Sequence, residues 1–260
     1  MSSVISFKHS GDIGDIIASL ATVKEICERD GGKAKIHLDI TGGLGDEFVP
    51  LQSRNGHTKF NEKSAAFLKP LIETQPYVSS VVLDRPPISA DVNLNMFRRS
   101  FIDKDIISKT NQNLMYLHQI TFNLEIGYKG PWIFAKKNPK NHKLLICRTP
   151  RYQSAHIICD ILANDKNAEF MGTDFEWELW RQTFGQYPQG GRVEIKDLLD
   201  ASSHIASSDM FFSNGTCFYW VAVGLGHCNI YHELGCDIPT TYFRNQNPKI
   251  TYFIGGRKVL

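Results

Sequence analysis

A short loop near the start of the chain brings together residue types suited to acid–base chemistry. The sequence SGDIGD (10–15) follows the β-branched and aromatic run VISFKH (4–9). Its two glycines permit backbone conformations closed to other residues and let a ligand approach closely. Asp15, near the start of the next helix, is a candidate general base for an incoming hydroxyl group. The alternative is that Asp12 and Asp15 only cap the turn.

A second candidate loop is basic. Arg148 and Arg151 follow the apolar run KLLIC (143–147) and lie three residues apart. Guanidinium groups bind phosphate oxygens through paired hydrogen bonds, so two of them beyond a strand end can hold a diphosphate. Tyr152 is placed to line the same site. A solvated basic loop is the alternative interpretation.

Two further loops in the second half carry groups that suit a nucleotide. The turn SNGT (213–216) leads into an apolar helix, and such a turn presents backbone amides and the positive end of the helix dipole to an anion. Glu233 ends the run NIYHE (229–233), where its carboxylate can accept hydrogen bonds from ribose hydroxyls. The alternatives are an ordinary strand–helix turn and an exposed glutamate.

The segment NMFRRSF (95–101) mixes basic and aromatic side chains. If the chain acts on a nucleic acid, Arg98 and Arg99 are suited to contact its phosphates, and the phenylalanines are suited to stack on a base. The alternative is a surface loop anchored by buried phenylalanines.

Strands and helices alternate along the chain and position these loops. Predicted strands cover 4–9, 34–40, 78–84, 143–149, 168–173, 192–195, 210–214 and 229–233, with helices between most of them, while 41–61 and 85–105 show no clear period. Alternation of this kind predicts parallel sheets built from βαβ units, which bind ligands beyond the carboxyl ends of their strands.

The segment 127–142 is rich in Gly, Pro, Asn and Lys and is the predicted linker between two halves. The predicted fold class is therefore α/β, with two Rossmann-like domains facing a cleft. We expect residues 1–126 to form an N-terminal domain on the side of an acceptor and residues 143–260 to form a C-terminal domain that binds a nucleotide sugar.

Composition excludes several classes of protein. The chain has 260 residues, of which 42% are apolar, enough for one large or two small folded domains rather than a disordered chain. The net charge of +2 gives little support to a dedicated nucleic-acid binder. The six cysteines form no C-x-x-C pair, and the sequence MSSVISFKHSGD is not a secretory signal. We therefore expect buried, reduced thiols, a cytoplasmic location and no stable membrane insertion.

Two segments resemble a known enzyme family. The sequence KHSGDIGDIIASLATVKEI (8–26) is similar to the opening of GT-B glycosyltransferases related to the ADP-heptose–lipopolysaccharide heptosyltransferases. The run DLLDASSHIASSDMFFSNGTCFYWVAVGLG (197–226) resembles a later motif of that family, in which a small-residue phosphate loop precedes an Ala-rich helix. The family loop usually reads Asp-Thr-Gly with a following His, whereas this chain has Ser-Asn-Gly-Thr.

The resemblance implies an inverting, metal-independent glycosyltransferase with Asp15 as its catalytic base. It would transfer a hexosyl or heptosyl group from a nucleotide-diphosphate sugar to a hydroxyl of a glycan or of a modified DNA base, with no cofactor. The implied donor-binding residues are Arg148, Arg151, Ser213, Asn214, Gly215, Thr216 and Glu233. The residues expected around the first loop and the acceptor are His9, Gly11, Asp12, Gly14, Arg98 and Arg99.

A second function stays open, and a third is excluded. If Asp15 only caps a helix, the chain is a non-catalytic nucleotide- or sugar-binding module on the same scaffold. An NAD-dependent dehydrogenase is excluded because the first loop lacks the G-x-G-x-x-G fingerprint, and its carboxylates would repel a pyrophosphate.

Overall fold

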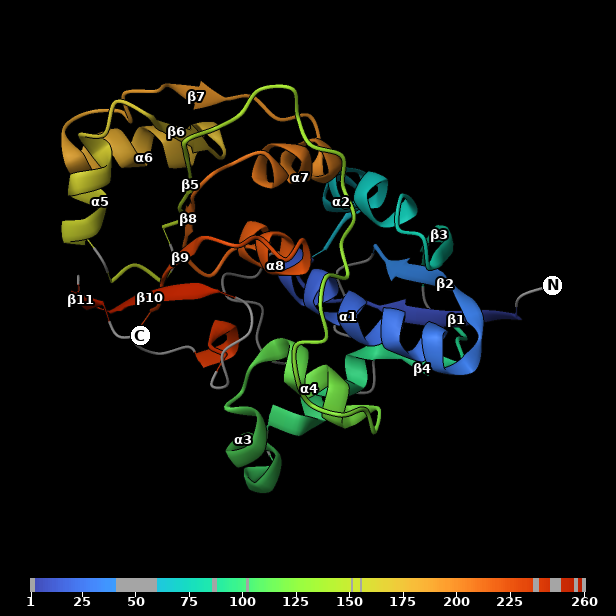
Figure 1. Cartoon of the computed structure of the whole chain (residues 1–260). Helices are drawn as coiled ribbons and strands as arrows, with labels where there is room; N and C mark the ends of the chain where they lie inside the picture. Colours follow the sequence, from blue (N-terminus) through green and yellow to red (C-terminus); the bar gives the residue numbers. More distant parts are fainter. Residues whose placement is uncertain are drawn as a thin grey trace. The chain divides into compact units, whose positions relative to one another are not determined.

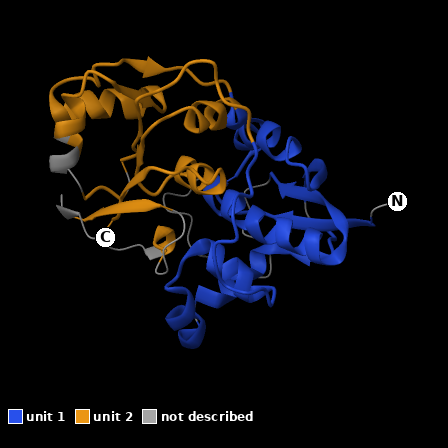
Figure 2. Cartoon of the chain, in the orientation of Figure 1, with its two compact units in different colours: residues 1–134, 197–199 blue, residues 135–196, 200–260 orange. Residues whose placement is uncertain are grey.

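The chain forms two compact units (Figure 2), one of residues 1–134 with 197–199 and the other of residues 135–196 with 200–260. The division after residue 134 lies inside the segment 127–142. The computed structural model describes residues 3–40, 60–85, 88–101, 103–150, 152–154, 156–235, 239–243, 249–254 and 257–258.

Unit 1 is built on a four-stranded parallel sheet with the strand order β3-β2-β1-β4 (Figure 1). Its strands are β1 (Ser3–His9), β2 (Gly32–Asp39), β3 (Val78–Asp84) and β4 (Val92–Asn93). Its helices are α1 (Ile13–Asp30), α2 (Glu62–Glu73), α3 (Lys104–Thr110) and α4 (Leu114–Thr121), with the 3-10 helix η1 (Leu94–Phe101). The sequence predicted β1 to β3 but not α3, nor β4 and η1, which lie in the stretch 85–105 without a clear period.

Helix α1 holds the first loop against the sheet. Ile17, Leu20 and Val23 recur at helical spacing and are buried, so one face of α1 belongs to the core. The helix ends at Gly31, whose φ of 69° is left-handed and whose N–H donates to the carbonyl of Cys27. A helix fixed by its core face and its C-cap gives the residues of its first turn defined positions at the end of β1.

Unit 2 is built on a seven-stranded sheet with the order β11-β10-β9-β8-β5-β6-β7, parallel except for β11. Its strands are β5 (Leu144–Cys147), β6 (Ala168–Met171), β7 (Arg192–Val193), β8 (Phe211–Ser213), β9 (Ile230–Glu233), β10 (Ile250–Ile254) and β11 (Arg257–Lys258). The helices that follow these strands are α5 (His156–Ala163), α6 (Asp174–Phe184), α7 (Leu198–Ala206), α8 (Cys217–Gly224) and the 3-10 helix η2 (Pro239–Thr241). The sequence predicted β5 to β9 but not the last two strands.

Strand order places the ligand-binding edge of each unit. Numbered from its own first strand, β5 to β10 have the Rossmann order 3-2-1-4-5-6, and unit 1 has the half-order 3-2-1-4. In such sheets ligands bind outside the carboxyl ends of the strands where the order reverses. That point lies between β1 and β4 in unit 1 and between β5 and β8 in unit 2. The predicted α/β class with parallel sheets is confirmed.

The cysteines follow the sequence expectation only in part. Cys27, Cys147 and Cys159 are buried free thiols, and burial raises the pKa of Cys27 to about 11 and that of Cys159 to about 12. Cys228, by contrast, is exposed, and Cys236 lies outside the described residues. Among the described helices, none combines the length and apolar character needed to cross a bilayer.

Candidate functional site

The first loop is shorter than the sequence predicted. Helix α1 begins at Ile13, so Gly14 and Asp15 belong to its first turn rather than to the loop, and Asp12 is the N-cap residue. The side chain of Asp12 makes no capping hydrogen bond. Capping therefore does not account for the carboxylate of Asp12. The side chain of Asp15 is 22% exposed, which leaves its carboxylate accessible to a ligand.

A buried arginine faces the carboxylate of Asp15. Arg98 Nη2 lies 3.6 Å from Asp15 Oδ2, and the Arg98 side chain is only 4% exposed. Arg98 Nη1 donates a 2.8 Å hydrogen bond to Asn95 Oδ1, which also accepts from the N–H and the hydroxyl of Ser10 at 3.1 Å. The prediction of a surface position is wrong for Arg98, because η1 turns its side chain inward, whereas Arg99 is exposed.

Two neutral histidines surround this arginine. His9 and His118 are fully buried, with ring centroids 5.8 Å apart, and His118 stacks on Phe97 at 4.1 Å. Burial, followed by the charge of Arg98, lowers the pKa of His118 to about 3 and that of His9 well below its ordinary value. His9 Nδ1 accepts the N–H of Gly11 at 2.9 Å, so the proton of the neutral ring is on Nε2.

Gly11 is needed for space rather than for its backbone conformation. A Cβ atom at this position would lie 2.6 Å from His9 Cε1, 2.8 Å from Arg98 Nη2 and 2.9 Å from Asp15 Oδ2. Neither Gly11 nor Gly14 has a positive φ. The prediction that these glycines provide a conformation closed to other residues is therefore wrong. At Gly11 three protein side chains approach closely, and the approach of a ligand stays a prediction.

In unit 2, two predicted donor-binding residues bind each other. Arg148 Nε donates to Glu233 Oε2 at 2.7 Å, and Arg148 Nη2 donates to Glu233 Oε1 at 3.0 Å. Their side chains are 3% and 0% exposed. The backbone N–H of Ser154 also donates to Glu233. The sequence predicted separate contacts of these residues with phosphate and ribose, and did not predict their pairing.

The predicted phosphate loop 213–216 is held by its own side chains. Asn214 Oδ1 accepts the N–H of Thr149 at 3.0 Å, and Asn214 Nδ2 donates to the carbonyl of Thr149 at 2.9 Å, which joins the loops after β5 and β8. Thr216 is the N-cap of α8, and its hydroxyl accepts the N–H of Tyr219. The hydroxyl of Ser213 is buried and donates to the carbonyl of Asn214 at 3.2 Å.

Tyr152 lies between two glycines at the same edge of unit 2. A Cβ atom on Gly215 would be 2.8 Å from Tyr152 Cδ2, and one on Gly235 would be 3.0 Å from Tyr152 Cα and Cβ. Tyr152 has a φ of 62°, an unusual value for a residue with a side chain. Tyr152 therefore packs against the loop after β8, and its role in lining the donor site stays a prediction.

Three other features bear on the predicted sites. Arg151 lies outside the described residues.

Asp103 and Asp105 are two residues apart, a spacing that can hold a cation. Asp103 Oδ1, however, accepts the N–H groups of Asp105 and Ile106 and so caps α3. Within the described ranges, His, Cys, Asp and Glu side chains form no group of three or more that could hold a metal ion.

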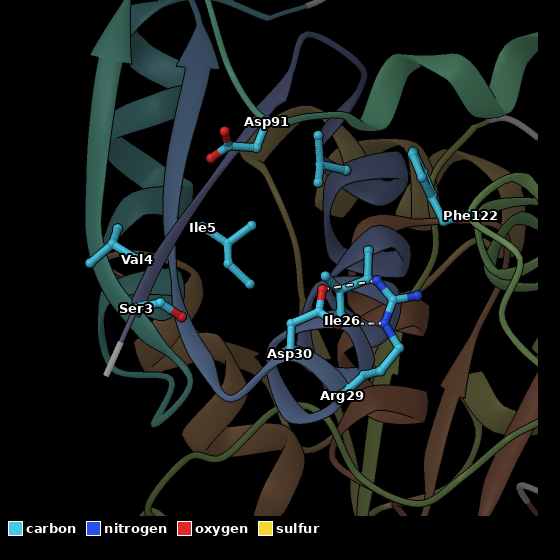
Figure 3. A pocket seen from close by; sticks show the side chains of 9 residues that line it. Ser3, Val4, Ile5, Ile26, Arg29, Asp30, Asp91 and Phe122 are labelled. Atoms are coloured by element: carbon cyan, nitrogen blue, oxygen red, sulfur yellow. Dashed lines mark hydrogen bonds and ion pairs between the residues drawn. The ribbon is translucent and has the colours of Figure 1, made fainter. Parts of the chain in front are cut away.

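A pocket of about 430 Å³ lies elsewhere in unit 1. Figure 3 shows it beside Ser3, Val4 and Ile5 at the amino end of β1, with Arg29 and Asp30 hydrogen-bonded to each other on its wall. Asp15 follows the carboxyl end of β1, so this pocket lies at the opposite end of that strand. Parallel sheets bind their ligands at the carboxyl edge, and we assign no role to this pocket.

The sequence missed Asn95 and His118 as members of the site. Asn95 follows β4, which has only two residues and no alternating pattern. His118 lies in α4, where a lone histidine carries no sequence signal of a site. Recognition of β4 as the neighbour of β1 would have identified Asn95, because both strands end at the same edge.

The sequence matches no protein-family model and no curated protein. Solved structures nevertheless match over nearly the whole chain. The glycosyl transferase family 9 protein from Veillonella parvula has a TM-score of 0.63 at 9% identity and covers 97% of this chain and 87% of its own. The E. coli heptosyltransferase WaaC with ADP has a TM-score of 0.60 at 7% identity, with 98% and 94% covered.

A third solved structure is similar as well. The E. coli ADP-heptose lps heptosyltransferase II has a TM-score of 0.54 at 11% identity, and the alignment covers 97% of this chain and 90% of that one. These identities are low, so the comparisons establish the fold. The chain has the α/β GT-B fold of the heptosyltransferases, as the resemblance in its sequence predicted.

Proposed function

We propose that this chain is a glycosyltransferase that moves a sugar from a nucleotide-diphosphate sugar to an acceptor hydroxyl, with inversion at the anomeric carbon. The observation that carries the proposal is the position of Asp15. Its partly exposed carboxylate lies in the first turn of α1, at the point where the strand order of unit 1 reverses. The three similar solved structures named above are glycosyltransferases, which supports the same reaction class.

In this proposal Asp15 is the general base. Its carboxylate takes the proton of the acceptor hydroxyl, and the oxygen attacks the anomeric carbon of the donor. The bond from that carbon to the diphosphate oxygen breaks, and the nucleoside diphosphate leaves with the electron pair. One displacement of this kind inverts the anomeric configuration. Of the two arginines expected to contact acceptor phosphates, Arg98 is buried and Arg99 is exposed, so the acceptor is proposed only as a hydroxyl group, of a glycan or of a modified DNA base.

Unit 2 is the proposed donor-binding unit. The start of α8 and the loop 213–216 follow β8 at the reversal point, where helix amides favour a diphosphate. Arg151 is a further proposed phosphate ligand. Arg148 and Glu233 hold the ends of β5 and β9 in place through their ion pair, and their contacts with phosphate and ribose stay predictions. The positive charge from helix amides and arginine makes a metal ion unnecessary in this proposal.

Thermal unfolding tests the donor site directly. The chain is screened with nucleoside diphosphates and nucleotide sugars in the presence of a chelator, beginning with ADP because the similar WaaC structure is described with ADP. A ligand at about 100 times its Kd adds about 2.7 kcal/mol to the free energy of unfolding, and the resulting rise in melting temperature is readily measured. No shift with any nucleotide would contradict the proposal.

The Asp15→Asn variant separates an enzyme from a binding module. The substitution keeps the size of the side chain and removes its basicity. If the chain is an enzyme, donor binding persists and transfer is lost. If it is a non-catalytic module, the variant and the original chain behave alike.

A further inference from the structure

Several buried nitrogen atoms in and around Arg98 lack hydrogen-bond partners within the described residues. His9 Nε2, Arg98 Nη2 and both ring nitrogens of His118 have no hydrogen-bond partner within the described part of the chain. Buried polar groups in folded proteins nearly always have a partner, whether protein, water or ligand. A guanidinium N–H without a hydrogen-bond acceptor is the most costly of these, because its group is charged. The arrangement therefore indicates a bound group beside Arg98.

The geometry shows where that group is held. Arg98 Nη2 and Asp15 Oδ2 are 3.6 Å apart, too far for a hydrogen bond and close enough for one oxygen atom to contact both. Both atoms also lie within 3 Å of the position that a Cβ of Gly11 would occupy. They therefore face the backbone of the first loop from the same side. The partial exposure of Asp15 leaves a route for a ligand to reach this pair.

The charges favour a neutral group over an anion. Burial lowers the pKa of Arg98, and the carboxylates of Asp15 and Asp12 oppose that shift, so the guanidinium is already balanced by carboxylates. The two buried histidines add no positive charge, because burial holds their pKa values below the ordinary value. A phosphate or carboxylate would be repelled by Asp15. A hydroxyl group satisfies both partners, because it donates to the carboxylate and accepts from the guanidinium.

We propose that Arg98 is a second catalytic residue, whose Nη2–H donates a hydrogen bond to the acceptor hydroxyl oxygen that Asp15 deprotonates. This inference rests on the proposed function. As the O–H bond breaks, the proton passes to Asp15 and negative charge develops on the oxygen, which then forms the bond to the anomeric carbon. The hydrogen bond from Arg98 stabilises that charge in a buried site, where such a bond is strongest.

The test uses the donor alone, with water as the acceptor. The rate of nucleoside diphosphate release is measured with the nucleotide sugar that gives the largest thermal shift, for the original chain and for Arg98→Gln, Arg98→Lys and Arg98→Ala. Loss of one preorganised donor is expected to lower kcat about 10²- to 10³-fold, with the KM for the donor unchanged. Arg98→Lys is expected to retain more activity than Arg98→Gln, and methylguanidinium to restore part of the activity of Arg98→Ala.

The control is Arg29→Gln, which removes an exposed arginine from the last turn of α1. It is expected to match the original chain. Each variant is also tested for cooperative unfolding and for the thermal shift given by the nucleoside diphosphate, so that loss of structure is recognised as such. If an Arg98 variant fails to fold, the comparison with Arg98→Lys and the rescue of Arg98→Ala decide the question.

Two other results have distinct meanings. If Asp15→Asn abolishes release but Arg98→Gln stays within about threefold of the original kcat, Arg98 is structural and this inference is overturned while the proposed function stands. If no nucleotide sugar binds, or Asp15→Asn has no effect, the proposed function fails and the role of Arg98 fails with it.

Discussion

Arg148 and Glu233 form a two-point ion pair across the end of β8, with Nε–Oε2 at 2.7 Å and Nη2–Oε1 at 3.0 Å. Ser213, at the end of β8, pairs with Cys147 of β5 on one side and with His232 of β9 on the other. Arg148 directly follows β5, and Glu233 is the last residue of β9. The pair therefore ties β5 and β9 together at the edge where the donor is proposed to bind.

Removal of one partner of this pair is predicted to be costly. Glu233→Gln leaves the buried guanidinium of Arg148 without a counter-charge, and loss of one partner of a buried pair destabilises a protein by about 3–5 kcal/mol. The measurement is the free energy of unfolding in urea. The matched control is Glu178→Gln, whose ion pair with Arg181 is about half exposed and is expected to contribute less than about 1 kcal/mol. Equal losses for the two variants would contradict this account.

Stability is predicted to fall at acid pH because of His118. Burial lowers its pKa from 6.5 to about 3, so below pH 6.5 the unfolded chain binds a proton that the folded chain does not. Protonation of His118 in the unfolded chain therefore leaves the free energy of unfolding unchanged above pH 6.5, the pKa of His118 in the unfolded chain. Between pH 6.5 and pH 3 it lowers that free energy by about 1.4 kcal/mol per pH unit. The free energy of unfolding is measured between these limits for the original chain and for His118→Leu.

The variant isolates this one titration from those of other groups. Burial also lowers the pKa values of His9 and His232, and carboxylates lose or gain protons at acid pH, but these groups are present in both chains. The slope of stability against pH is predicted to be smaller in His118→Leu by about one proton. Equal slopes would mean that His118 is protonated in the folded chain.

Gly215 is predicted to be coupled to Tyr152. Gly215→Ala brings a methyl group to 2.8 Å from the Tyr152 ring and is expected to cost about 1–3 kcal/mol and to weaken nucleotide binding. In a Tyr152→Ala background the ring is absent and the same substitution is expected to cost less than about 0.5 kcal/mol. A double-mutant cycle of thermal stability measures this coupling.

Gly235→Ala is the control for that cycle. Its added methyl group meets Tyr152 Cα and Cβ, atoms that an alanine retains. Tyr152→Ala should therefore leave the cost of Gly235→Ala unchanged. If it relieves both glycine substitutions equally, the Tyr152 ring is not the contact that matters.

The positions at strand ends could be predicted from the sequence, but their partners could not. Asp15, Arg148, Thr216 and Glu233 all follow or end strands, as the alternation of strands and helices indicates. The pairing of Arg148 with Glu233 depends on the strand order β5-β8-β9, which brings residues from distant parts of the sequence to one edge. No local sequence pattern indicates that strand order.

The environment of Arg98 was also beyond sequence reasoning. A basic residue flanked by Phe97 and Arg99 is typical of an exposed loop, and tertiary contacts overrule that expectation. Asn95 accepts hydrogen bonds from both Ser10 and Arg98, which fixes η1 against the first loop. The strands β4 and β11 were missed because runs of two residues have no periodicity to detect, whereas the equally short β7 was predicted from the run RVEI (192–195).

Replacement of Asp15 by Asn tests the central claim most directly. The release of nucleoside diphosphate from a nucleotide sugar is measured for both chains, together with the thermal shift that the nucleoside diphosphate gives. This account predicts that Asp15→Asn loses release by about 10²-fold or more, with the thermal shift unchanged. Release at the original rate, with the same thermal shift, would show that Asp15 is not the base and would contradict the account.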